Sequence, residues 1–241
     1  MERYYNAGYY LIKKQPIDFG DDKEKIVSTC SGCINATAFD TWAWSWSTQL
    51  DKKVQSFLEL TDNTIQLIQE WTDKKFDNGE IGFGNVFPDL KMALEFKDLF
   101  YKDRQDIEIF AVDFSETDTN NLIEDFAPGE NEGFNFNNGH FGLRENLLKK
   151  NHETADSISH ILGFDFIGVE CDGSFHSFYC HNITKELIDK FGLVINENGL
   201  FESIPDPDLI RDYLNDQETG LEPVPWYIVK VKKIKIPGGN V

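Results

Sequence analysis

The first part of the chain has the apolar and alternating patterns of β-strands. Apolar blocks in residues 3–14 and 25–30 predict two strands. Pro16 and a turn at Gly20-Asp21-Asp22 separate them. In residues 39–48, tryptophan alternates with alanine and serine, which predicts a third strand with its indoles on one face. These indoles are Trp42, Trp44 and Trp46.

Helical spacing follows these strands. Apolar residues recur at intervals of three or four in residues 50–60 and 62–76, and an Asn-Gly dipeptide supplies a stop after the second segment. A third amphipathic segment extends from Pro88, which suits a first helical turn, to about Tyr101. We therefore expect three consecutive helices.

The middle of the chain predicts a buried strand and several short helices. Residues 106–114 are dense in β-branched and aromatic residues, which is typical of a central strand. Helical patterns follow in residues 118–126, 143–151 and 153–162. Residues 128–142 form a Gly- and Asn-rich loop, and long loops of this kind are often functional.

The last third of the chain has the clearest turn and capping signals. Residues 164–180 predict a hairpin with Asp172-Gly173 as a two-residue turn. Helices are expected over 184–191 and after Asp206-Pro207, an N-cap followed by a first-turn proline. Residues 226–236 predict a terminal strand at an exposed edge of the sheet. The lysines that would protect this edge are Lys230, Lys232, Lys233 and Lys235.

Helices and hairpins are interspersed without strict β-α-β alternation. This pattern favours an α+β fold with a mixed, mainly antiparallel sheet and several packed helices. With 241 residues, the chain is expected to form a single domain over 1–241. The loop 128–142 is the candidate position for a loose joint.

Composition supports a folded protein and limits its partners. Hydrophobic residues make up 40% of the chain and aromatic residues 14%, so a core can form despite the high charge. The net charge of -19 argues against nucleic acid or an anionic membrane as a partner and leaves basic proteins open. Neither an export signal nor a long apolar run is visible, so we expect a cytoplasmic protein with reduced cysteines.

Acidic residues are densest in residues 103–132, where ten acidic residues and one arginine give a net charge of -9. The segment lacks the spacing of a calcium-binding loop. It is interpreted either as a solvated face or as a docking surface for a cationic protein, since opposite charge raises association rates. The candidate contact residues are Asp113, Glu116, Asp118, Glu124, Asp125, Glu130 and Glu132.

The tryptophan ladder has two interpretations. Trp42, Trp44 and Trp46 would form a contact surface for a partner if they faced solvent, because indoles make good binding hot spots. If they faced inward, they would bury several hundred Å² and stabilise the core. We include the ladder among the candidate partner-binding residues.

The cysteines leave four alternatives open. Cys30 and Cys33 form a C-x-x-C pair, a spacing used by thiol oxidoreductases and by half of many zinc sites. A zinc site would combine this pair with Cys180 and His181. A thiol enzyme would use Cys180 as nucleophile with His176 or His181 as base. The fourth alternative is that the cysteines are small buried apolar residues, in which case no cofactor is expected.

The predicted hairpin constrains these alternatives. With a two-residue turn, Cys171 would pair with Ser174 and Cys180 with Asp165, placing the two cysteines roughly 20 Å apart along the strands. They are therefore not expected to bind one metal ion. His176 would lie opposite Val169.

The chain lacks the phosphate-binding, dinucleotide-binding, serine-hydrolase and zinc-protease motifs. It carries aromatic segments such as Gly-Phe-Asp-Phe-Ile-Gly-Val-Glu and Ser-Phe-His-Ser-Phe. With its acidic, aromatic-rich α+β character, the chain resembles the intracellular immunity proteins that bacteria pair with polymorphic toxins. The resemblance implies a non-enzymatic protein that binds and occludes one cognate toxin. It assigns no functional residues.

Overall fold

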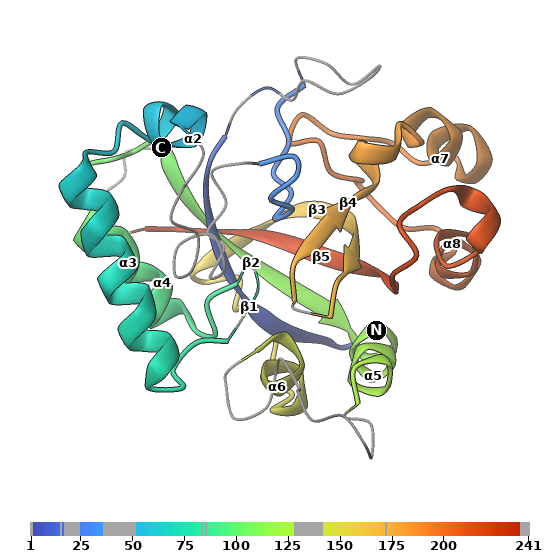
Figure 1. The fold of residues 1–241 in the computed structure, drawn as a ribbon. Coiled ribbons are helices and arrows are strands. Elements are labelled where there is room, and N and C mark those ends of the chain that lie inside the picture. Colours follow the sequence, from blue (N-terminus) through green and yellow to red (C-terminus); the bar gives the residue numbers. More distant parts are fainter. Residues whose placement is uncertain are drawn as a thin grey trace.

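The structure, a computed structural model, describes residues 2–14, 16, 25–35, 52–82, 84, 86–127, 142–171 and 173–236. These residues contain a curled five-stranded sheet in the order β1-β2-β5-β3-β4, and each neighbouring pair is antiparallel (Figure 1). The strands are β1 (Tyr4–Lys13), β2 (Ile107–Ser115), β3 (Ser159–Val169), β4 (Phe175–Ser177) and β5 (Trp226–Ile234). The expected α+β class is confirmed.

Helices surround this sheet (Figure 1). On the left of Figure 1 lie α3 and α4, on the right α7 and α8, and below the sheet α5 and α6. The helices are α2 (Lys52–Leu58), α3 (Asp62–Asp77), α4 (Leu90–Phe100), α5 (Glu116–Asp125), α6 (Leu143–Leu148), α7 (Thr184–Phe191) and α8 (Pro207–Leu214), with 3-10 turns η2 (Phe178–His181) and η3 (Gln217–Thr219).

Local capping signals placed several of these helices correctly. The Asp206 carboxylate accepts a hydrogen bond from the Leu209 N–H at 3.2 Å, and Pro207 occupies the first turn of α8. Gly192 ends α7 in the left-handed conformation, where a side chain would be strained. Ser115 caps α5 by accepting from the Asp118 N–H at 3.1 Å, so α5 starts directly from β2.

The two faces of the sheet are filled differently. One face packs apolar strand residues against α5 and α6. The other face carries two apolar clusters, one with α2, α3 and α4 and one with α7 and α8. On β5, Ile228 belongs to one cluster and Ile234 to the other, and Lys230 and Lys232 lie between them. A polar strip therefore separates the two apolar clusters.

The position of β5 differs from the sequence prediction. This strand lies in the middle of the sheet, between β2 and β3, and both Lys230 and Lys232 are buried. Their charges are compensated: the Glu153 carboxylate lies 2.8 Å from Lys230 Nζ and 2.9 Å from Lys232 Nζ. Lys232 also donates to the Thr154 carbonyl at 2.7 Å and to Asp156 Oδ1 at 3.1 Å. Paired lysines can thus occupy a central strand, and the edge prediction is wrong.

Two further segments differ from their local patterns. Residues 25–30 form no strand of the described sheet, although Ile26 makes an isolated bridge to Pro16. The Ser28 N–H donates to the Asn198 carbonyl, and Asn35 Nδ2 donates to two carbonyls of the segment. Residues 153–162 were expected to be helical, but β3 begins at Ser159, which pairs with Ile234. Pairing with β5 outweighs the weak helical periodicity there.

The hairpin of β3 and β4 is present with a longer connection than predicted. Val169 pairs with Phe175, and Glu170 N–H donates to the Ser174 carbonyl at 2.9 Å. His176 therefore lies opposite Gly168, one position away from the predicted register. A shift of one residue changes which face a side chain occupies.

Substitution of Phe110 tests how much the core of the sheet contributes to stability. Its ring is fully buried and stacks on Tyr10 with centroids 5.1 Å apart. We expect Phe110→Ala to lower the free energy of unfolding by about 3–5 kcal/mol, from lost burial and the remaining cavity. Urea denaturation measures this loss. Leu99→Ala, at a side chain with 59% exposure, is the control and should cost less than about 1 kcal/mol. Equal losses in both variants would contradict the assigned core.

Candidate functional site

A groove lies where α5 approaches α8 and the segment that leads into β5. Two hollows of about 690 Å³ and 500 Å³ share Asn121 and Asn215 in their walls. Leu214, Leu221 and Trp226 contribute apolar surface to the larger hollow. We call the two hollows together the acidic groove, because its lining includes Glu124, Asp125, Asp208, Asp212, Asp216 and Glu222.

Hydrogen bonds fix the walls of the acidic groove. Asn215 Nδ2 donates to the Trp226 carbonyl at 3.0 Å, and the Trp226 N–H donates back to Asn215 Oδ1 at 2.9 Å. The Trp226 indole N–H donates to the Glu222 carbonyl at 3.1 Å. Across the groove, the Tyr227 hydroxyl donates to Asp125 Oδ2 at 2.6 Å. These bonds join α5, the end of α8 and the start of β5 into one preformed wall.

The lining carries uncompensated negative charge. Arg211 is its one basic residue within the described parts of the chain, and this guanidinium is already engaged. Arg211 Nε lies 2.7 Å from Asp118 Oδ1, and Nη1 lies 2.6 Å from Asp208 Oδ1. Within the described residues, no ion pair or side-chain hydrogen bond compensates the exposed carboxylates of Glu124, Asp212 and Glu222. These three groups remain available to a cation from outside.

Only part of the sequence-predicted acidic surface belongs to this groove. Glu124 and Asp125 line it, as expected for exposed residues of α5. Glu116 is half-buried at the start of α5 and accepts a hydrogen bond from the Tyr5 hydroxyl at 3.2 Å. Asp118 is fully buried against Arg211, so it holds α5 to α8 and is not exposed to a partner.

Asp113 is also buried, on the inner part of β2. It accepts a hydrogen bond from Asn6 Nδ2 at 2.9 Å, and burial raises its pKa to about 6. A buried carboxyl cannot form part of an exposed docking surface, so the prediction of Asp113 as a contact residue is wrong. The remaining candidates lie outside the described residues: Glu130, Glu132, Trp42, Trp44 and Trp46.

Sequence reasoning missed the contribution of the C-terminal region to the groove. Asp208, Asp212, Asp216 and Glu222 lie in or after α8, far from the dense acidic segment in sequence. The spacing of four between Asp208 and Asp212 places both on one face of the helix, which is a detectable signal. Their approach to α5 depends on tertiary structure.

The structure separates the C-x-x-C pair and forms a different cysteine pair. Cys30 is fully buried, and burial raises the pKa of its thiol. Cys33 and Cys171 are exposed, and Cys180 is half-buried. The thiols of Cys33 and Cys180 lie close enough for their interaction to lower the pKa of Cys33 and raise that of Cys180. Cys180 lies in η2, beyond the end of β4, which the predicted hairpin did not anticipate.

Two histidines flank this region. His176 Nε2 lies 2.9 Å from Glu170 Oε1, which gives this imidazole a carboxylate partner. His181 packs its ring edgewise against Trp226, and burial lowers its pKa. The described residues contain no group of three or more His, Cys, Asp or Glu side chains arranged to hold a metal ion. The zinc set of Cys30, Cys33, Cys180 and His181 is therefore not assembled there.

Comparison of the chain with protein-family models, curated proteins and solved structures gave no match. No helix in the described residues combines the length and apolar character needed to cross a membrane.

The buried carboxyl of Asp165 on β3 gives a testable dependence of stability on pH. Its carboxyl is fully buried, and desolvation raises its pKa from 3.8 to about 7. Below pH 3.8, the ordinary pKa of the carboxyl, Asp165 is neutral in both the folded and the unfolded protein, so its ionisation does not affect stability. As pH rises toward 7, ionisation favours the unfolded chain, so stability is lost. Asp165→Asn should therefore stabilise the protein increasingly between about pH 4 and pH 7, by on the order of 4 kcal/mol at the upper end.

Urea denaturation across this pH range measures the difference between Asp165→Asn and the unsubstituted protein. Asp98→Asn is the matched control, because this exposed residue on α4 is solvated in both the folded and unfolded states. A stability difference for Asp165→Asn that stays constant with pH would contradict the assigned ionisation of Asp165.

Proposed function

We propose that this protein is a non-enzymatic binding protein that holds a Lys- or Arg-rich segment of a partner protein in the acidic groove. The observation that carries the proposal is the charge balance of the lining. Glu124, Asp212 and Glu222 have no cationic partner among the described residues, and Arg211 is occupied by Asp118 and Asp208. A basic segment supplies the missing positive charge.

The shape of the acidic groove suits long basic side chains. Its larger hollow, of about 690 Å³, falls within the range of known ligand pockets. Lysine and arginine pack their aliphatic stems on apolar surface and keep their charged ends near carboxylates. Leu214, Leu221 and Trp226 provide such a surface beside Glu124 and Glu222. A basic segment can therefore satisfy both the apolar and the charged parts of the groove.

The walls require little ordering upon binding. The paired hydrogen bonds between Asn215 and Trp226 already hold the end of α8 against β5. A preformed site spends less binding free energy on fixing its own side chains. The net charge of -19 further accelerates the approach of a cationic protein at low ionic strength.

The resemblance to immunity proteins gives this proposal a specific form. In that form the protein acts in the bacterial cytoplasm, its partner is one basic toxin, and occupation of the acidic groove blocks the toxin. The acidic groove and the lack of the common catalytic motifs support this form. Protection of cells that express such a toxin, lost when the groove carboxylates are neutralised, is the corresponding cellular result.

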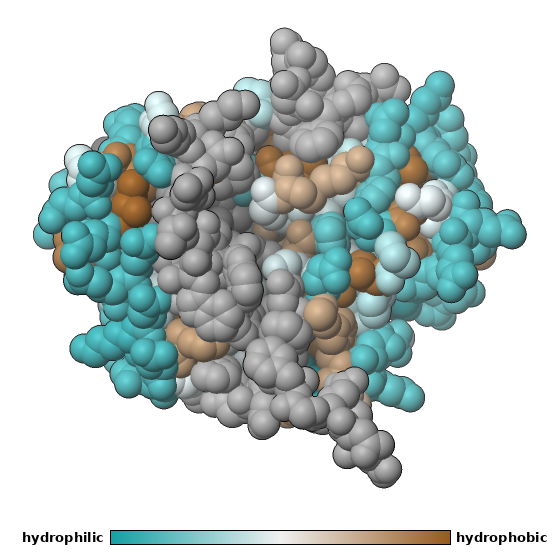
Figure 2. Space-filling model, viewed as in Figure 1, coloured by the Kyte–Doolittle hydropathy of each residue, from teal (hydrophilic) through white to brown (hydrophobic). Residues whose placement is uncertain are grey.

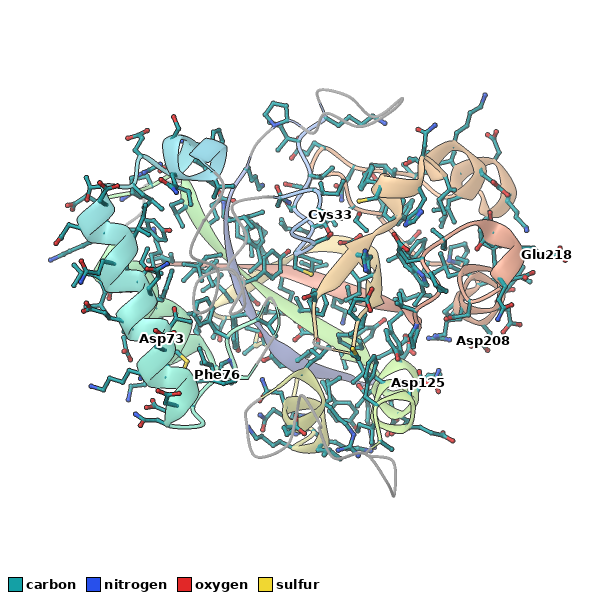
Figure 3. The ribbon with its side chains drawn as sticks, viewed as in Figure 1. Cys33, Asp73, Phe76, Asp125, Asp208 and Glu218 are labelled. Atoms are coloured by element: carbon teal, nitrogen blue, oxygen red, sulfur yellow. The ribbon has the colours of Figure 1, made fainter. Side chains whose placement is uncertain are left out.

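The direct test compares two charge-matched variants. The groove variant is Glu124→Gln, Asp212→Asn and Glu222→Gln. The control variant, Glu70→Gln, Asp73→Asn and Asp77→Asn, changes exposed residues of α3, on the opposite side of the molecule from the groove (Figure 3). Each variant loses three negative charges from -19, which leaves -16 in both. Any effect of total charge is therefore equal.

Fluorescence anisotropy with a labelled Lys/Arg-rich peptide at low salt measures affinity. We expect the groove variant to bind at least about tenfold more weakly than the unsubstituted protein, because charge-assisted contacts are lost. The α3 variant should change affinity by less than about threefold, since its carboxylates lie beyond the range of strong Coulomb interaction. Equal weakening in both variants would show that binding is non-specific and would overturn the proposal.

A further inference from the structure

Two cysteines from distant parts of the chain meet at one surface position. Cys33, which is labelled in Figure 3, lies in the turn that follows the buried residues 27–31. Cys180 lies in η2. Their thiols lie close enough for each to shift the pKa of the other. Cys33 is exposed and Cys180 is half-buried, so Cys33 is the more accessible of the two residues.

The surroundings of Cys33 favour its negatively charged form. The Ser31 hydroxyl lies 2.7 Å from Cys33 Sγ, and the nearby Ser177 backbone also favours the charged form of Cys33. His176, paired with Glu170, lies within electrostatic range. The interaction with Cys180, assisted by these groups and opposed by partial desolvation of the sulfur, lowers the pKa of Cys33 to about 6. Cys33 is therefore largely a thiolate at neutral pH.

Cys180 has the complementary property. Its interaction with Cys33, followed by burial, raises its pKa above the ordinary value. It therefore keeps its proton while Cys33 is a thiolate. A reactive thiolate beside a protonated second thiol is the arrangement needed for stepwise thiol–disulfide exchange.

We propose that Cys33 and Cys180 form a redox-active dithiol that becomes an intramolecular disulfide by exchange with a low-molecular-weight disulfide. Cys33 is the attacking residue and Cys180 the resolving residue. Cys30, although closer to Cys33 in sequence, is sealed in the apolar core and takes no part. This redox proposal does not depend on the proposed binding of a basic partner.

The reaction balances in two steps. The Cys33 thiolate attacks one sulfur of the small disulfide, which breaks the S–S bond, forms a mixed disulfide and releases the first thiolate. Cys180 then loses its proton to solvent, and its sulfur attacks Cys33 Sγ. This attack releases the second small thiolate and forms the Cys33–Cys180 bond. Two electrons pass from the protein dithiol to the small disulfide, which leaves as two thiols.

Formation of this bond would tie the segment 27–35 to η2. The linked residues lie far apart in sequence, so the disulfide restricts the unfolded chain strongly. Oxidation should therefore raise the thermal unfolding midpoint of the protein. Reduction should return it to its original value.

The experiment uses the full reduced chain and oxidised glutathione as the probe. Intact-mass spectrometry and peptide mapping follow the products. The unsubstituted protein should lose two hydrogen atoms in mass and yield a cross-linked peptide containing Cys33 and Cys180. Cys180→Ser should stop at a stable glutathione adduct on Cys33, because the resolving thiol is absent. Cys33→Ser should form neither product at this site at a comparable rate.

Cys171→Ser is the matched control, since Cys171 is exposed but is not the assigned partner of Cys33. This variant should form the Cys33–Cys180 disulfide at the same rate as the unsubstituted protein. Far-UV circular dichroism establishes that each variant is folded. A disulfide that joins other cysteines would overturn the proposal. So would glutathione adducts that accumulate equally with and without Cys180, or reaction of Cys33 no faster than that of Cys171.

Discussion

The compensation of buried lysine charges in β5 is the constraint on which the rest of the fold depends. An unpaired ammonium group in this position would cost several kcal/mol. Glu153, the Thr154 carbonyl and Asp156 surround Lys232, and Glu153 also pairs with Lys230. All three residues lie just before β3, so satisfying the lysines also brings β3 beside β5. The last strand can thus complete the centre of the sheet.

The acidic groove follows from this arrangement. Because β2 and β5 are antiparallel neighbours, the end of β2 meets the start of β5, with Phe114 paired to Val229. α5 leaves from the end of β2, and α8 precedes β5 in the chain. Asp118 and Arg211 then bind the two helices together. Because Arg211 is engaged in this internal ion pair, the outer carboxylates of the groove are not neutralised by it.

Hydrophilic residues gather over the outer surfaces of both helix groups, and brown apolar patches lie between them (Figure 2). Charge density in the sequence is a poor guide to which carboxylates are exposed. Asp113 and Asp118 belong to the densest acidic segment, yet both are buried in polar networks. Asp212 and Glu222 lie outside that segment but reach the acidic groove through tertiary contacts.

Local signals in the sequence predicted the elements better than their arrangement. Caps such as Asp206-Pro207 and Gly192 act within a few residues, so α7 and α8 could be located from the sequence. The alternation of lysine in β5 predicted an edge strand, because the residues that compensate these lysines, at 153–156, are distant in sequence. The meeting of Cys33 with Cys180 was equally hidden, since the length of the β3–β4 connection and the turn into η2 decide it.

The central claim is that a basic segment binds between α5 and α8. NMR titration of the isotopically labelled protein with a Lys/Arg-rich peptide tests it most directly, because each amide reports its own surroundings. The account predicts saturable shifts at Asn121 and Asn215, which line both hollows of the acidic groove. Shifts concentrated on α3, or spread evenly over all acidic surfaces, would contradict it.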